Sequence, residues 1–121
     1  MKILVFALVA STLLARAAAA APILKVSAVQ MRSVADLDKN VQKISQFLGT
    51  LAGQGVQIAV FPECALTEYD AELIKRTDPR KLAAALDAVG AACRKNKICA
   101  VMGSPEFRPD GKMWNSAWHL A

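Results

Sequence analysis

The stretch Val56-Gln57-Ile58-Ala59-Val60-Phe61-Pro62-Glu63 decides the fold, because it joins a continuous apolar run to an abrupt stop. Such a run is typical of a strand that is buried on both faces. Pro62 fixes its own φ and donates no backbone hydrogen bond, so the ladder of the sheet is expected to end there. In open α/β sheets, ligands bind just beyond the carboxyl ends of the strands. Glu63 is therefore a candidate site residue on its position alone.

An amphipathic helix is predicted before this strand. Apolar side chains recur at intervals of three and four residues from Val34 to Leu51, with polar residues off that stripe. Either Ser33 or Asp36 can cap the helix, because the two residues have the spacing of a capping box. Gly53 and Gly55 supply the stop and the turn into the strand.

A second helix is predicted after the strand. The segment 70–77 is polar and is expected to be irregular. Asp78 and Pro79 then form a helix-start signal, with the aspartate as cap and the proline in the first turn. An apolar stripe from Leu82 to Cys93 follows at helical spacing.

Three further segments are predicted to be strands. They are residues 23–30, residues 98–102 closed by Gly103, and residues 113–120 after a tight turn at 108–112. In the last strand, Asn115, Ala117 and His119 alternate with Trp114, Ser116, Trp118 and Leu120 on the opposite face. The order predicts an α/β protein with parallel strands first and an antiparallel strand last.

Two helices can cover one face of such a sheet, whereas near-continuous apolar strands need cover on both faces. We therefore expect residues 21–121 to be the N-terminal part of a larger domain. The alternative is a small two-layer domain.

Residues 1–20 resemble a secretory signal peptide. Lys2 precedes an apolar run from Ile3 to Leu14, and Ala18-Ala19-Ala20 forms a small-residue cleavage site. The run is shorter than the roughly 20 residues that a spanning helix needs, so no stable membrane anchor is expected. The sequence predicts an exported protein, either periplasmic or secreted, with an uncleaved anchor as the alternative.

The positive charge of the chain does not indicate nucleic-acid binding. The formal charge is +5, and the predicted signal peptide holds two of the 15 basic residues, Lys2 and Arg16, but none of the 10 acidic ones. The remaining charge of +3 is spread along the chain without interleaved aromatic residues. A solvated surface is the better interpretation.

The chain contains three cysteines, Cys64, Cys93 and Cys99. An exported protein can pair two of them, and an odd number leaves one free or bonded elsewhere. Cys93 and Cys99 fall in apolar patterns and are expected to be small buried side chains. His119 is the single histidine and no CxxC pair occurs, so neither a metal nor another cofactor is expected.

Five motifs in order resemble the nitrilase superfamily, the carbon–nitrogen hydrolases. Phe61-Pro62-Glu63 is the central one, and alone it would be a weak signal. The others are the opening strand at 26–31, the helix that begins near Asp36, Thr67-Glu68-Tyr69, and Gly111-Lys112-Met113-Trp114-Asn115-Ser116-Ala117. The family usually has glycine where Glu68 stands. Five motifs spread over residues 26–120 make the resemblance specific.

The resemblance implies a four-layer α-β-β-α sandwich, of which residues 21–121 would be the N-terminal part. It also implies hydrolysis of amide, nitrile, ureide or N-carbamoyl substrates by a cysteine nucleophile, a glutamate base and a lysine. Glu63 would be the base, and the full-length protein is expected to form a homo-oligomer, at least a dimer. The family's lysine and cysteine follow the aromatic-Asn-Ser strand. Lys112 precedes that strand and Cys64 adjoins the glutamate, so neither residue matches.

Each candidate residue also has a plainer interpretation. Glu63 could cap a loop, and Tyr69 could be half-buried packing instead of a substrate-binding side chain. Asn115 is expected to satisfy backbone groups near the site, and His119 to be a core or surface residue. The alternative for the whole chain is a non-catalytic binding or assembly module, or a decayed fragment, derived from such a hydrolase.

Overall fold

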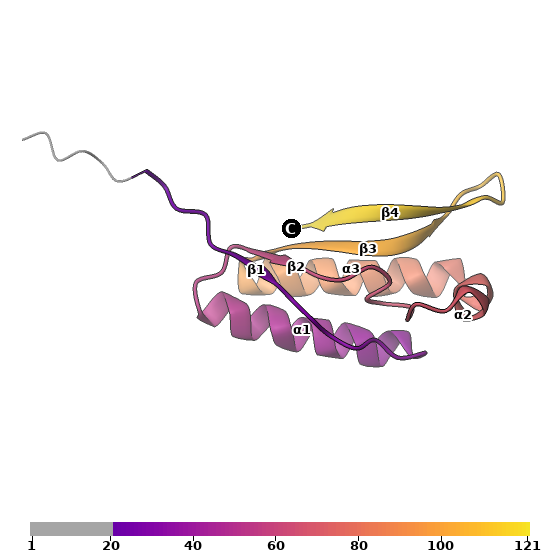
Figure 1. Ribbon diagram of the computed structural model, residues 1–121, viewed down its shortest axis with the longest axis horizontal. Helices are drawn as coiled ribbons and strands as arrows, with labels where there is room; N and C mark the ends of the chain where they lie inside the picture. The colour runs from indigo at the N-terminus through magenta and orange to yellow at the C-terminus, as the bar shows by residue number, and fades with distance from the viewer. Residues whose placement is uncertain (1–20) are drawn as a thin grey trace, which may run out of the picture.

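The computed structural model describes residues 21–121, which form one four-stranded sheet with helices on one of its faces (Figure 1). The signal peptide predicted for residues 1–20 lies outside this range. Across residues 21–121, no helix is both long enough and apolar enough to cross a bilayer. The elements are, in order, β1 (Val26–Ala28), α1 (Leu37–Gly53), β2 (Ile58–Val60), α2 (Ala71–Arg76), α3 (Pro79–Asn96), β3 (Cys99–Phe107) and β4 (Met113–Leu120).

The strands lie in the order β1-β2-β3-β4, with the first three parallel and β4 antiparallel to β3. This confirms the predicted topology, although β1 is shorter than the predicted strand at 23–30. On the β3 side of β2, the backbone N–H of Phe61 donates to the carbonyl of Val101 at 2.8 Å. Pro62 follows and has no N–H to donate. The strand therefore ends where the proline predicted.

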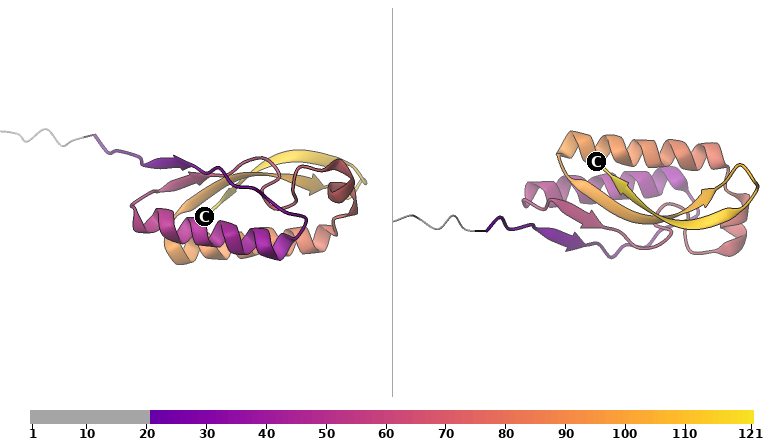
Figure 2. Two further views of the ribbon diagram at one scale, coloured as in Figure 1. Left: turned by 60° about the horizontal axis from the view of Figure 1, so that its bottom comes forward. Right: turned by 90° about the horizontal axis from the view of Figure 1, so that it is seen from above.

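Helices α1 and α3 lie side by side on one face of the sheet (Figure 2). Ile44 and Leu48 of α1 are completely buried against a sheet surface that includes Ala59 and Ala100. Burying an aliphatic side chain of this size is worth roughly 2 kcal/mol. Cys93 of α3 is buried in the same core, as its place on the apolar stripe predicted.

The opposite face of the sheet has no helix on it within residues 21–121 (Figure 2). Val26 and Val60 are 52% and 38% exposed on this side. Successive residues of a strand point to opposite faces, so Met102 belongs to the core and Gly103 to the open face. The residue that follows Pro62 lies over this open face.

Helix α2 corrects the prediction that residues 70–77 are irregular. The Asp70 carboxylate caps it, accepting from the backbone N–H groups of Glu72 and Leu73 at 2.9 Å each. Leu73 and Ile74 are half-buried. A helix of less than two turns offers too few apolar positions for a periodic pattern to reveal it.

Strand β3 also differs from its prediction, because it continues through Gly103 to Phe107. The reason is its antiparallel partner, which pairs with β3 from Ala100 to Phe107. Pro105 is tolerated there because the pairing of β2 with β3 ends at Val101, and a strand without a neighbour on one side can accept a proline.

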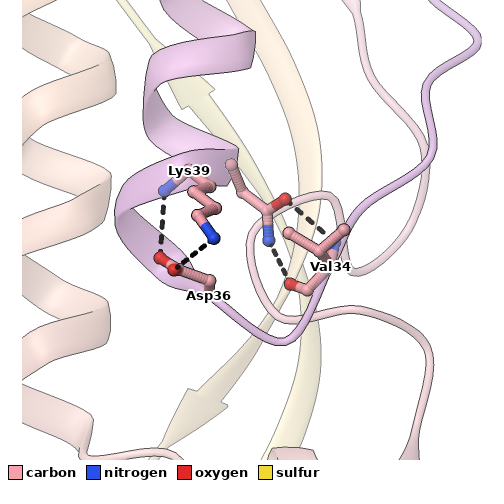
Figure 3. A network of polar contacts seen from close by, with 4 residues as sticks. Val34, Asp36 and Lys39 are labelled. Atoms are coloured by element: carbon pink, nitrogen blue, oxygen red, sulfur yellow. Dashed lines mark hydrogen bonds and ion pairs between the residues drawn. The ribbon is translucent and has the colours of Figure 1, made fainter.

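The N-terminus of α1 is capped by Asp36, which decides between the two predicted caps. Its carboxylate accepts from the backbone N–H of Lys39 at 3.1 Å and lies 3.6 Å from the Lys39 ammonium (Figure 3). The bond from the Lys39 N–H holds the pKa of Asp36 below its usual range.

Asn40 joins α1 to two loops and is completely buried. Its amide oxygen accepts from the N–H of Val34 at 3.0 Å, and its amide nitrogen donates to the Val34 carbonyl at 2.6 Å. The same nitrogen donates to the carbonyl of Leu66 at 2.7 Å. Leu66 belongs to the loop that follows Pro62, so α1 holds this loop in place.

The loop at 61–70 contains two residues with left-handed backbone conformation. Cys64 has a φ of 55° and Glu68 a φ of 65°. The Cys64 carbonyl accepts from the N–H groups of Thr67 at 3.1 Å and Glu68 at 3.0 Å, which closes a tight turn. Glycine adopts such a φ without a steric penalty, whereas another residue loses about 1 kcal/mol. This explains why the family motif that residues 67–69 resemble usually has a glycine where this chain has Glu68.

Replacing Asn40 by alanine should destabilise the protein by about 3 kcal/mol, because it leaves buried polar groups of two loops without partners. The free energy of unfolding can be measured by urea titration. Gln46→Ala, at an exposed position of the same helix, is the matched control and should change it by less than about 0.5 kcal/mol. A loss below about 1 kcal/mol for Asn40→Ala would contradict the role of Asn40.

Replacing Glu68 by glycine should stabilise the protein by about 0.5 kcal/mol, because relief of the left-handed conformation exceeds the entropy that glycine adds to the unfolded chain. The matched control is Glu72→Gly in helix α2, which should destabilise it by about 1 kcal/mol. The same urea titration compares the two variants. Equal destabilisation by both would show that the turn at Glu68 is unstrained.

Candidate active site

Glu63 lies at the carboxyl end of β2, directly after Pro62, and its side chain is exposed. Its backbone rests on β3. A Cβ atom built on Gly103 would lie 2.9 Å from the Cα of Glu63 and 3.5 Å from its Cβ and Cγ. Glu63 therefore stands on the open face of the sheet, at the edge where parallel α/β sheets place their ligands.

Asn115 of β4 holds the Glu63 carboxylate. Its amide nitrogen donates to Glu63 Oε1 at 2.6 Å, across 52 positions of sequence. The expectation that Asn115 satisfies backbone groups was therefore wrong, because its partner is a side-chain carboxylate. The alternation predicted for β4 did separate Asn115 from Trp118 and Leu120, which pack against the core on the opposite face. Within residues 21–121, Oε2 of Glu63 has no hydrogen-bond partner.

The residues on either side of Asn115 are held by a polar cluster on the other face of the hairpin. Ser116 donates to Glu106 Oε2 at 2.6 Å, and Arg108 Nε lies 3.2 Å from Glu106 Oε1. The Arg108 guanidinium also lies over the Trp114 ring, 5.2 Å from its centre. These contacts restrain β4 at Trp114 and Ser116, and so they fix the position of Asn115 between them.

A pocket of 330 Å³ adjoins the Glu63–Asn115 pair. Its volume is in the range of small-ligand sites. Helix α2 contributes Ile74, the loop before it contributes Tyr69, and β4 contributes Met113 and Trp114. Tyr69 is 76% exposed, so its side chain is not half-buried packing in this part of the chain. The pocket thus combines an apolar wall with a carboxylate and an amide.

A larger cavity of 620 Å³ lies on the helix side, beside α1, α2 and α3. Its lining combines small apolar side chains with opposite charges, among them Asp36, Arg76 and Lys81, and includes neither Glu63 nor Asn115. Volume alone therefore does not identify the site. The smaller pocket is the stronger candidate because it adjoins a positioned carboxylate.

The other candidate residues do not join Glu63 as reactive groups. Cys64 borders the pocket but is only 5% exposed, and burial raises the pKa of its thiol, which disfavours the reactive thiolate. Lys112 pairs with Asp110 in the hairpin turn at 3.4 Å. His119 is exposed on β4, opposite Val101. Among the residues from 21 onward, no three His, Cys, Asp or Glu side chains gather as metal ligands.

Two parts of the site were missed by sequence reasoning. Ile74 reaches the pocket from a helix that was not predicted, and no local pattern identifies it. The sequence pattern predicts that Gly103 ends a strand, whereas β3 continues through it. A glycine inside an apolar strand is also a signal for close approach of another backbone, and that interpretation would have found it.

The family match and the solved structures agree with this fold. Residues 25–121 match the carbon-nitrogen hydrolase family. A glutamine-dependent NAD+ synthetase from Acinetobacter baumannii is 26% identical, with a TM-score of 0.72. The matched region comprises 80% of this chain and 18% of the synthetase chain. An amidase from Nesterenkonia sp. is 16% identical, with a TM-score of 0.71. Here the matched region comprises 79% of this chain and 37% of the amidase chain.

A mutant of the Nesterenkonia sp. AN1 amidase, with acrylamide added at its active-site cysteine, is 16% identical with a TM-score of 0.74. The matched region comprises 80% of this chain and 39% of the amidase chain. No curated protein sequence matches this chain. The chain thus spans well under half the length of these solved structures.

The similarity to the amidases is at the level of the fold, whereas the family match extends over nearly all of the described residues and includes Glu63, Gly103 and Asn115. On that match, and with the strand order and helix placement of its structural neighbours, this chain belongs to the carbon–nitrogen hydrolase family of the nitrilase superfamily.

Proposed function

We propose that this chain is the N-terminal part of an amidase-like hydrolase of non-peptide carbon–nitrogen bonds, with Glu63 as its general base. The observation that supports this most is the Glu63 carboxylate, held by Asn115 at 2.6 Å beside a pocket. The family resemblance assigns the nucleophile and an electrostatic role to a cysteine and a lysine. No residue of this sequence matches either, so we expect residues 21–121 alone to be inactive.

In this proposal the two oxygens of the Glu63 carboxylate have different tasks. Oε1 accepts from Asn115, which orients the group, and Oε2 would act as the base. In the proposed first step Oε2 takes the proton of the cysteine thiol, and the thiolate sulfur attacks the carbonyl carbon of the substrate. The carbon–nitrogen bond then breaks, the leaving amine takes the proton back from Glu63, and a thioester remains.

In the proposed second step the same oxygen takes a proton from water, and the resulting hydroxide attacks the thioester carbon. The carbon–sulfur bond breaks, the acid product leaves, and the thiol regains its proton from Glu63. A fixed carboxylate suits both steps because a base must lie within hydrogen-bond distance of the proton that it removes.

The pocket suggests the class of substrate. Ile74 and Met113 supply apolar surface next to the carboxylate, Trp114 borders the pocket from β4, and Tyr69 presents a ring with a hydroxyl group. A small uncharged amide with an apolar substituent fits this lining, because apolar surface gains from burial while a charged group would lose its hydration. We propose Tyr69 as a substrate-binding residue on the same grounds. We also propose that the full-length protein is exported, on the ground of residues 1–20. The further proposal that it forms a homo-oligomer rests on the family resemblance.

Glu63→Gln should abolish turnover in the full-length protein, because an amide cannot accept the proton that the mechanism assigns to Oε2. The assay follows ammonia release from a panel of short aliphatic and aromatic amides. Glu72→Gln, on the exposed surface of α2, is the matched control and should retain its rate. Undiminished turnover by Glu63→Gln would rule out its role as base.

Cys64→Ser should retain most of the turnover, because Cys64 is a buried structural side chain and not the nucleophile. In the parent protein, which retains Cys64, iodoacetamide at pH 7.5 should alkylate this thiol much more slowly when the protein is folded than in urea, since burial raises the pKa of the thiol and restricts access. Mass spectrometry of the peptides measures this. Loss of activity in Cys64→Ser with an unchanged melting temperature would make Cys64 a catalytic candidate.

A further inference from the structure

At Gly103, β3 approaches the backbone of Glu63 closely. The nearest atom to a Cβ built there is the Glu63 Cα, at 2.9 Å. Real Cβ contacts of this kind are hardly ever below 3.0 Å. Because the obstacle is main chain, no side-chain rotation can relieve the clash. Either Glu63 or β3 would have to move.

The need for glycine at this position is spatial. Gly55 and Gly111 are the glycines with positive φ in the described chain, at 76° and 78°, and Gly103 is not among them. Its backbone conformation suits any residue of a strand, and it pairs with Ala117 in regular antiparallel register. Glycine is therefore needed at position 103 because it has no Cβ, which leaves room for the Glu63 backbone.

Gly103 and Asn115 act on the same carboxylate from two directions. Gly103 sets how closely the Glu63 main chain lies on the sheet, and Asn115 binds its side-chain oxygen at 2.6 Å. Asn115 comes from the strand next to Gly103, where it faces Pro105. A displacement of Glu63 away from β3 would therefore change its distance from Asn115.

We propose that Gly103 is a positioning residue for the base, because it lets the Glu63 backbone rest directly on β3 and so brings the carboxylate to Asn115. This inference rests on the proposed function of Glu63. Adding a methyl group at Gly103 would move Glu63 by about 0.5 Å, the tolerance within which catalytic groups must be held.

The test is Gly103→Ala in the full-length protein, with Gly53→Ala as the matched control. Gly53 ends helix α1, and a Cβ built there meets no atom within 4 Å. We expect Gly103→Ala to lower kcat about tenfold or more, with a smaller change in KM, and Gly53→Ala to leave both unchanged. A kcat within about twofold of the parent in Gly103→Ala would overturn the inference.

A double mutant separates positioning from general damage. If Gly103 acts by bringing Glu63 to Asn115, then Gly103→Ala should lower kcat by a smaller factor in an Asn115→Ala background, which keeps Glu63 but lacks the contact, than in the parent. An equal loss in both backgrounds would contradict a positioning role. If Gly103→Ala fails to fold, the measurement is repeated in the Gly53→Ala background at lower temperature. Failure to fold there as well would also overturn the inference, since Gly103 would then serve folding as a whole.

A measurement independent of activity distinguishes this inference from the proposed function. The side-chain amide NMR signals of Asn115 should shift towards those of a free asparagine in Gly103→Ala and stay unchanged in Gly53→Ala. Unchanged Asn115 signals in Gly103→Ala would overturn the inference. Full turnover in Glu63→Gln would overturn the proposed function, and the NMR result would still decide whether Gly103 maintains the contact.

Discussion

The end of the β2 hydrogen-bond ladder is the constraint on which the rest of the site depends. The Phe61 N–H makes a backbone bond to β3, and Pro62 has no N–H with which to continue. The chain must therefore leave the ladder directly before Glu63. Helices α1 and α3 lie on the other face of the sheet (Figure 2). Glu63 lies over the open face, where a Cβ built on Gly103 would be 2.9 Å from its Cα. One proline thus places a charged group at the edge where a ligand can reach it.

The loop that carries Glu63 is held by polar contacts and not by apolar packing alone. Asn40 reaches it from the buried side of α1 through the Leu66 carbonyl, and the Cys64 carbonyl closes a turn within it. Buried amides are costly unless every group is paired, so such a network favours a single arrangement of the loop. A carboxylate that works as a base needs this kind of fixed main chain beneath it.

The antiparallel strand β4 completes the geometry around that carboxylate. Parallel strands end at one edge of the sheet, whereas β4 runs back along β3 and brings Asn115 to Glu63. On the other face of the hairpin, Glu106 and Arg108 hold the two residues that flank Asn115. The amide and the carboxylate are thus fixed by separate parts of the chain. Residues 25–121 match the carbon-nitrogen hydrolase family, and the proposed chemistry rests on this carboxylate–amide pair.

Local sequence determined those features that depend on a repeating pattern or on a single residue's backbone chemistry. The strand end at Pro62, the cap at Asp78, the strand topology and the two faces of β4 were all predictable in this way, and so was Glu63 as the candidate residue. Only the tertiary structure decided that Asn115 bonds the carboxylate, that α2 forms a pocket wall and that Gly103 supports Glu63. The physical reason is that periodicity encodes which face a side chain occupies, whereas contacts between residues 40 or 52 positions apart arise from how the elements pack.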